Sequence, residues 1–173
     1  HLGLHGAFLR IVAKVFEHDH ELVAAQAGNG IGIAHRVAQP LPDLHFVSLG
    51  EVSYRLISSA GAARAALNPA DYIRASFSPA FDSAHGQALP EMTATPIATG
   101  QNAAVAGLLS SFGGAGFVLE TTAAEMVATT RFQIVTDVEP ITQPVYAAMH
   151  QRHRPQRAYR RLVKGMQKHF PTR

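Results

Sequence analysis

Two hydroxyl side chains lie where a strand is expected to end and a helix to begin, in the stretch IRASFSPAFD at residues 73–82. Ser78 and Pro79 are typical of a helix start, because serine is a favoured N-cap and proline suits the first helical position. Ser76 and Ser78 would therefore lie beside unpaired backbone N–H groups, which attract small anions. Two interpretations are open: Ser78 only caps its helix, or the junction binds an anionic ligand.

Polar side chains also mark two further strand–helix junctions. Gln101 and Asn102 follow a strand expected near residues 92–97 and precede a helix with apolar residues at helical spacing. Their amides suit a carboxylate or a ring substituent, although Asn102 suits an N-cap equally well. The other junction is at residues 4–8, where His5 would titrate near neutral pH and favour an anion, or simply lie at the surface.

We expect no metal site, no cofactor and no catalytic residue. The stretch EHDHE at residues 17–21 groups possible ligands, but no His-x-x-x-His pair accompanies it and the chain has no cysteine, so a solvated helix end is favoured. The sequence has no Gly-rich phosphate loop, no serine nucleophile elbow and no paired acid–base carboxylates.

The composition indicates a globular protein. Of the 173 residues, 47% are hydrophobic and 16% charged, and no apolar stretch approaches the length of a membrane span. The first residues lack the pattern of a signal peptide, so we expect a cytoplasmic location and no membrane partner. The net charge of +3 arises from basic residues near the C-terminus, in a pattern more typical of a solvated helix face than of a nucleic-acid contact.

Strands alternate with helices through most of the chain, which predicts an α/β fold with mainly parallel strands. Ligands of such sheets bind at the carboxyl ends of strands, where the three junctions lie. We expect strands at 44–49 and 53–58 joined by Gly50 and Glu51, a helix ended by Gly113 and Gly114, a capping box formed by Thr122 and Glu125, and a last helix at 156–170.

From about Leu44 to Phe170 this series of elements resembles the effector-binding domain of LysR-type transcriptional regulators. The stretch AVAGLLSSFGGAGFVLE is similar to the family's helix, glycine turn and buried strand, and AAEMVATTRFQIV to the helix and return that follow. SYRLISSAGAARAALNPADYIRASFSP resembles the crossing into the second subdomain. PVYAAMHQRHRPQRAYRRLVKGMQKHF resembles the strand that crosses back and the closing helix.

The resemblance implies two Rossmann-like α/β subdomains joined by two crossing strands, as in type 2 periplasmic binding proteins. The first subdomain would be residues 1–57 plus 146–173, and the second 58–145. The family binds a small effector, often a carboxylate, in the cleft between subdomains. The matching positions in this sequence, and so the expected effector-binding residues, are His5, Gly6, Ala7, Phe8, Ser76, Phe77, Ser78, Gln101 and Asn102.

The expected function is therefore effector sensing in a homodimeric or homotetrameric bacterial regulator. This chain contains no N-terminal winged helix-turn-helix, so DNA would be contacted only through that part of the full-length protein. The stretch between Leu22 and Ile33 is also shorter than the family's. A solute-binding protein of a transporter is an alternative on the same fold. A less favoured one is a prephenate-dehydratase-like enzyme, whose Thr-Arg-Phe motif matches residues 130–132.

Overall fold

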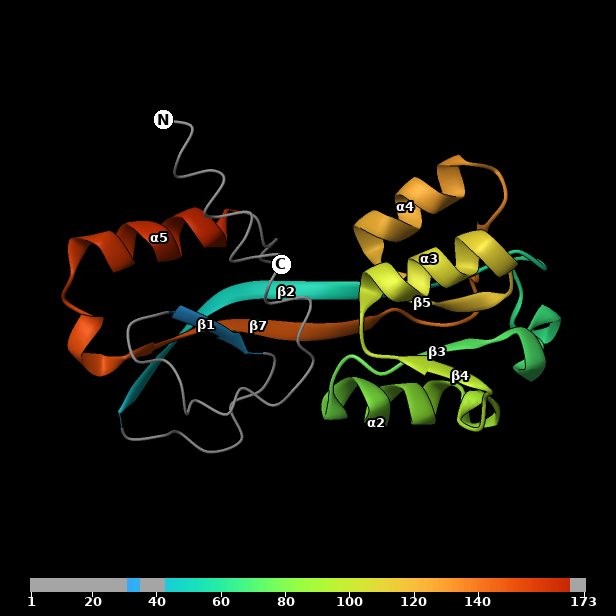
Figure 1. Cartoon of the computed structure of the whole chain (residues 1–173), viewed down its shortest axis with the longest axis horizontal. Coiled ribbons are helices and arrows are strands. Elements are labelled where there is room, and N and C mark those ends of the chain that lie inside the picture. Colours follow the sequence, from blue (N-terminus) through green and yellow to red (C-terminus); the bar gives the residue numbers. More distant parts are fainter. Residues whose placement is uncertain (1–30, 35–42, 169–173) are drawn as a thin grey trace. The chain divides into compact units, whose positions relative to one another are not determined.

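The computed structural model describes residues 31–34 and 43–168 of the chain, which divide into two compact units (Figure 1). Of the described residues, unit 1 contains 53–142, and unit 2 contains 31–34, 43–52 and 143–168. The alternating elements confirm the predicted α/β class. They are β1 (Ile31–Ala34), β2 (Leu44–Ser58), β3 (Ile73–Ala75), α2 (Pro79–Ala88), β4 (Ile97–Thr99), α3 (Asn102–Phe112), β5 (Ala115–Leu119), α4 (Glu120–Ala128), β6 (Gln133–Ile134), β7 (Ile141–His150) and α5 (Arg157–Gln167).

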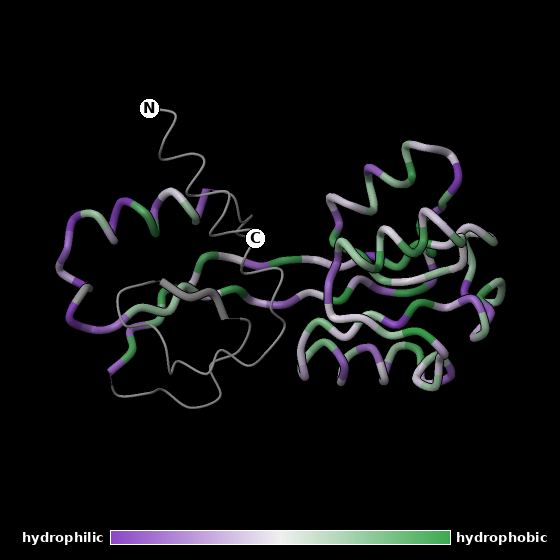
Figure 2. The backbone as a smooth tube through the Cα atoms, in the orientation of Figure 1, coloured by the Kyte–Doolittle hydropathy of each residue, from purple (hydrophilic) through white to green (hydrophobic). Residues whose placement is uncertain are grey.

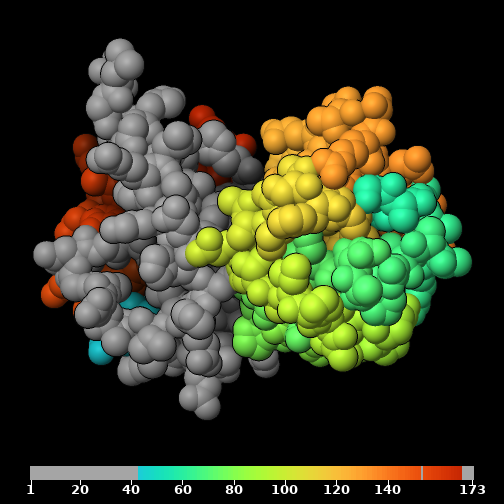
Figure 3. Space-filling model, turned by 45° about the vertical axis from the view of Figure 1, so that its right-hand side comes forward, coloured from blue at the N-terminus to red at the C-terminus, as the bar shows by residue number. Residues whose placement is uncertain are grey.

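In unit 1, helices cover both faces of the strands. Gly116 and Phe117 are neighbours on β5, so their side-chain positions point to opposite faces. A Cβ at Gly116 would lie 3.4 Å from Val105 of α3, whereas Phe117 meets Phe81 of α2 with ring centroids 5.7 Å apart. Helices α3 and α2 therefore lie on opposite sides of β5, and Figure 3 shows α2, α3 and α4 at the surface of this unit.

An aromatic cluster forms the centre of unit 1. Tyr54 of β2 stacks on Phe77 with ring centroids 4.6 Å apart, and Phe81 of α2 contacts both rings edge-on at 5.1 and 4.9 Å. Phe117 completes the cluster from β5. Each of these four rings is at most 5% exposed. Burial of large aromatic side chains contributes strongly to stability, so this cluster fixes the strand ends that carry the candidate site.

In unit 2, helix α5 packs on the sheet through one face. Val163 and Met166 are buried there, and the side chain of Gln167 donates a hydrogen bond to the carbonyl of Ser48 on β2 at 2.8 Å. Figure 2 shows the alternation of hydrophilic and hydrophobic segments along this helix. Strand β1 pairs antiparallel with β7, with Ile31 opposite Met149. The last helix expected at 156–170 is thus present as α5, with an apolar face packed on the sheet.

The two strands expected at 44–49 and 53–58 are one continuous strand, β2, so the predicted break at Gly50 and Glu51 is wrong. Gly50 adopts a φ of 141°, which glycine accepts because it has no Cβ. The glycine therefore lets the strand continue instead of starting a turn. Both unit boundaries fall inside strands, since β2 passes from residue 52 to 53 and β7 from 142 to 143.

The prediction of mainly parallel strands is also wrong. Strands β3 and β4 are parallel, but the β1–β7, β2–β5 and β2–β6 pairs are antiparallel. Parallel neighbours need a long crossover connection, usually helical, and α2 supplies one between β3 and β4. The other three pairs join strands that are not linked by a single crossover helix, so the alternation of elements did not determine their direction.

Candidate ligand-binding site

Ser76 and Ser78 lie at the junction between β3 and α2, as predicted. Ser78 is the N-cap of α2, with its hydroxyl oxygen accepting a hydrogen bond from the Phe81 N–H at 3.1 Å. Ser76 connects the two parallel strands, because its N–H donates to the Thr99 carbonyl at 3.0 Å. The capping interpretation of Ser78 is confirmed, while a ligand role for either serine stays a prediction.

The carboxylate of Asp82, in the first turn of α2, was not anticipated as part of this junction. The Ser76 hydroxyl donates to Asp82 Oδ2 at 2.8 Å, and Arg74 Nη2 lies 3.7 Å from Asp82 Oδ1. An ionised carboxylate only accepts hydrogen bonds, so Ser76 has already given its proton and offers lone pairs to any other partner. An acidic residue in the first helical turn complements the helix dipole, and this was the available sequence signal.

Gln101 and Asn102 lie at the second junction, after β4. The backbone N–H of Gln101 approaches Thr99 Oγ1 at 3.4 Å, and Gln101 is the N-cap residue of α3. Asn102 is the first residue inside the helix, so the interpretation of Asn102 as an N-cap is wrong. Its side chain accepts a hydrogen bond from the Leu119 N–H at 2.8 Å and donates to Thr122 Oγ1 at 3.0 Å.

Asn102 therefore joins the start of α3 to the end of β5 and the start of α4. Its contact with Thr122 also explains why the predicted capping box of Thr122 and Glu125 is wrong. Helix α4 begins at Glu120 with Leu119 as its N-cap, so Thr122 is already in the first turn. Its hydroxyl accepts a hydrogen bond from Asn102 and does not cap the start of α4.

The two junctions meet at one edge of unit 1. Because β3 and β4 run parallel with Ala75 opposite Thr99, their carboxyl ends bring Ser76 and Ser78 to the same edge as Gln101. The side chain of Phe77 points the other way, since it is 5% exposed and stacks on Tyr54. This edge combines the starts of two helices with hydroxyl and amide groups, an arrangement that suits hydrogen-bonding to a small polar ligand.

Other predicted positions contribute less to a site. His5, Gly6, Ala7, Phe8 and the EHDHE stretch lie outside the described residues. Within the described residues, no group of three histidine or acidic side chains could hold a metal ion. Among these residues, too, no helix is long and apolar enough to cross a membrane.

The Thr-Arg-Phe stretch at residues 130–132 forms a turn after α4. Thr130 has a φ of 63°, and the Arg131 guanidinium donates to the Ser110 carbonyl at the end of α3 while lying 5.6 Å from the Phe132 ring centroid. Phe132 is 3% exposed. These contacts support the interpretation of the three residues as a structural turn into β6.

Comparisons with solved structures identify the fold. The C-terminal domains of a LysR family protein from Agrobacterium tumefaciens strain C58 match with a TM-score of 0.63 and 16% identity, over 95% of this chain and 91% of that one. The regulatory domain of MetR from Neisseria meningitidis matches with a TM-score of 0.65 and 11% identity, over 93% and 86%.

Full-length LysG from Corynebacterium glutamicum, with arginine bound as effector, matches with a TM-score of 0.56 and 18% identity over 80% of this chain. The chain spans about half the length of that regulator, 50%. No family model matches the sequence, and no curated protein matches it. The structural likeness confirms, at the level of the fold, the resemblance seen in the sequence: the chain has the fold of LysR-family regulatory domains.

Proposed function

We propose that this chain is the effector-sensing domain of a LysR-type transcriptional regulator and binds a small organic ligand, in our expectation a carboxylate. The observation that carries the proposal is the match to LysR-family regulatory domains over nearly the whole of both chains. The edge formed by the ends of β3 and β4 supports it, because it presents hydroxyl and amide groups beside two helix starts. The two subdomains at 1–57 with 146–173 and 58–145, and the cleft between them, stay predictions.

The hydrogen bonds at this edge suggest how a ligand would be oriented. Ser76 donates its proton to Asp82, so it would accept a hydrogen bond from an N–H or O–H group of the ligand. A carboxylate of the same ligand would be received by backbone N–H groups at a helix start, where the helix dipole favours negative charge. Ligands that carry both a carboxylate and a donor group, such as amino or hydroxy acids, are therefore the first class to examine.

The mechanism would be a shift of populations rather than a chemical reaction. A ligand that binds one conformation of the domain more tightly than another increases the share of that conformation. In a full-length homodimeric or homotetrameric regulator this change would be transmitted to the DNA-binding part. Only the difference in binding free energy between the two conformations produces the effect, so ligand contacts that change between them determine the response.

Thermal unfolding of the chain against a panel of amino, hydroxy and simple carboxylic acids tests the proposal. A ligand at a hundred times its Kd adds about 2.7 kcal/mol of stability, which raises the Tm by several degrees for a chain of this size. We expect one chemical class to raise the Tm, and Ser76→Ala to weaken its binding about five- to tenfold through loss of one hydrogen bond.

Ser83→Ala is the control, because Ser83 is an exposed serine inside helix α2, beyond the junction, and its hydroxyl interacts with Gln87, one turn further along. This variant should bind the ligand as the unchanged chain does. A ligand whose Tm shift survives Ser76→Ala unchanged would place the binding site elsewhere. If no acid of the three classes raised the Tm, the proposed ligand chemistry would be rejected.

A further inference from the structure

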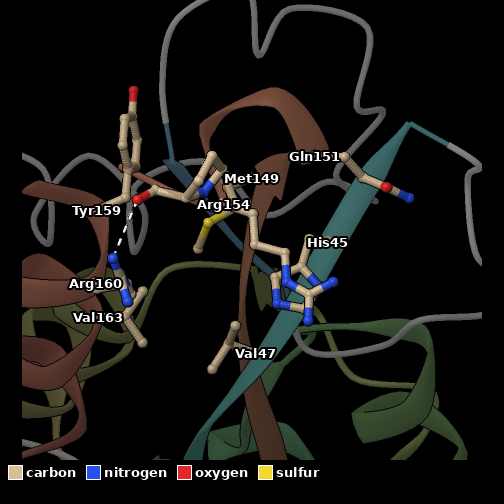
Figure 4. Close-up of a pocket in the computed structure, with 9 residues that line it drawn as sticks. His45, Val47, Met149, Gln151, Arg154, Tyr159, Arg160 and Val163 are labelled. Carbon is tan, nitrogen blue, oxygen red and sulfur yellow. Dashed lines mark hydrogen bonds between the residues drawn. The ribbon is translucent and has the colours of Figure 1, made fainter. Parts of the chain in front are cut away.

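Unit 2 contains a cavity of about 540 Å³ between β2, β7 and α5 (Figure 4). Every described residue that lines it belongs to unit 2, so it is separate from the candidate site at the edge of unit 1. Its volume lies within the range of small-molecule sites, about 300–1,000 Å³. No residue predicted from the sequence to bind a ligand lines this cavity.

Arginine side chains line the cavity from two sides. Arg154, in the turn before α5, extends towards β2, where His45 lies, and Arg160 comes from the first turns of α5 (Figure 4). A hydrogen bond from Arg160 Nη2 to the Pro155 carbonyl, at 3.2 Å, orients the Arg160 side chain. Guanidinium groups present planar sets of N–H donors that match carboxylate and phosphate oxygens.

The positive charge of this cavity has no carboxylate partner within the described residues. The ion pairs that join two described residues lie in unit 1, where Arg55, Arg64 and Arg74 meet acidic side chains. The sequence from residue 140 to the C-terminus contains no aspartate or glutamate at all. Helix α5 adds to the imbalance, since its first turn has no acidic residue to complement the positive end of its dipole.

The remaining wall of the cavity is apolar. Met149 of β7 and Val163 of α5 are 3% and 7% exposed, and Val47 of β2 is half-buried beside them. Inorganic phosphate would satisfy the arginines but leave this wall in contact with water. An anion with a hydrocarbon body would both bind the guanidinium groups and cover the apolar wall, and burying apolar surface adds to affinity.

We infer that this cavity binds an organic acid with an apolar body, with the carboxylate held by Arg154 and the body against Val47, Met149 and Val163. The inference does not depend on the proposed function, because it uses no residue of the unit 1 site. It gives the chain a second place at which a carboxylate is recognised. In a regulator it would make the chain responsive to two acids.

The four methionines make a direct test possible. Met149 lines the cavity and Met166 lies in the core of unit 2, whereas Met92 and Met126 lie in unit 1. We would label the methionine methyl groups with ¹³C and titrate the chain with 3-phenylpropanoate, its neutral amide and inorganic phosphate. We expect 3-phenylpropanoate to shift the Met149 methyl signal saturably and to leave Met92 and Met126 in place.

Two exposed arginines provide the matched variants. Arg154→Gln removes the guanidinium that extends into the cavity, and Arg161→Gln removes an exposed positive charge of α5 that does not line the cavity. Since one hydrogen bond to a charged group accounts for about a tenfold change in affinity, Arg154→Gln should raise the Kd about tenfold and Arg161→Gln should not change it measurably.

Four results would overturn the inference or a part of it. The first is an equal Met149 shift with the neutral amide, which would show that no anion is recognised. The second is an equal loss of affinity in both arginine variants, which would show attraction by overall charge alone. The third is an unmoved Met149 signal at about 10 mM acid, where even a millimolar site is mostly filled. Tighter binding of phosphate than of 3-phenylpropanoate would likewise reject the apolar part of the assignment.

Discussion

His85 is a titratable side chain with no exposed surface, on the inner side of α2. Its Nε2 atom is 2.8 Å from the hydroxyl of Tyr72, which is itself 1% exposed, and its Nδ1 atom has no hydrogen-bond partner. Burial lowers the pKa of His85, and the nearby Arg74 lowers it further, against smaller opposite effects of Asp82 and Glu91. These effects favour the neutral form of His85 in the folded protein.

The free energy of unfolding should fall as the pH is lowered through the ordinary pKa of histidine, about 6.5. Below that pH the unfolded chain binds a proton at His85 that the folded chain does not, so stability decreases by up to about 1.4 kcal/mol per pH unit. Urea denaturation between pH 7.5 and 5 measures this slope. In His85→Gln, whose amide can replace the contact to Tyr72, the slope should be smaller.

Tyr72→Phe separates titration from packing. This variant removes the hydroxyl next to His85 but keeps the buried imidazole, so it should be less stable than the unchanged chain and still lose stability towards acid. Equal slopes in His85→Gln and in the unchanged chain would show that the other histidines, not His85, cause the acid sensitivity.

For individual residues, the sequence was sufficient to locate the serine junction but not to predict its hydrogen bonds. Ser78 was recognisable because a cap and its proline are neighbours in the chain. Asp82 was not, because its partners Ser76 and Arg74 are brought to it only when the strand and the helix fold against each other. The same holds for Asn102, whose partners on β5 and α4 are 17 and 20 residues away.

The turn between α3 and β5 depends on two glycines with positive φ. Gly113 and Gly114 have φ angles of 78° and 90°, which residues with a side chain rarely adopt. A Cβ on Gly114 would also lie 2.0 Å from the carbonyl oxygen of Asp71. The turn thus brings two backbone segments so close together that only glycine fits, and the sequence identified it as a helix end for the correct reason.

Gly114→Ala should therefore be strongly destabilising, because the carbonyl of Asp71 must move and the backbone must be strained. We expect a loss of more than about 2 kcal/mol in the free energy of unfolding, at the upper end of single substitutions. Gly107→Ala is the matched control within α3, where an added Cβ meets nothing within 4 Å. It should raise stability by about 0.5–1 kcal/mol.

Chemical denaturation of both variants measures these changes. If Gly114→Ala cost no more than a few tenths of a kcal/mol, the close approach between the turn and Asp71 would not exist in solution.

Elements with such local signals were predicted well, whereas the course of β2 through Gly50 and the start of α4 were not. Both of these are determined by pairing with distant strands and side chains rather than by neighbouring residues.

Apolar burial is distributed unevenly over the described chain. Unit 1 contains the aromatic cluster of Tyr54, Phe77, Phe81 and Phe117, and most other buried hydrophobic residues. In unit 2 the buried apolar side chains within the described residues are Leu49, Val145, Ala147, Ala148, Met149, Val163 and Met166. Strand direction, which the sequence predicted wrongly, depends on this long-range assembly, because β2 pairs with strands more than 50 residues away.

Unit 1 should consequently fold without unit 2. Its described residues, 53–142, form one continuous stretch of chain with its own core, and a domain of this size is large enough to be stable alone. A fragment of residues 53–142 should give a dispersed amide NMR spectrum and a cooperative urea transition. Phe81→Ala in the same fragment should abolish both, because it removes a fully buried ring whose loss costs about 3–5 kcal/mol.

The fragment also separates the two binding proposals. The fragment retains Ser76, Ser78 and Gln101 but none of the residues that line the cavity in unit 2. The binding of 3-phenylpropanoate that we assign to this cavity should therefore be lost in the fragment. An unfolded fragment would show that the core of unit 1 needs the remainder of the chain. In that case unit 1 would depend on the part of β2 before residue 53 and on the part of β7 after residue 142, because these two strands continue from one unit into the other.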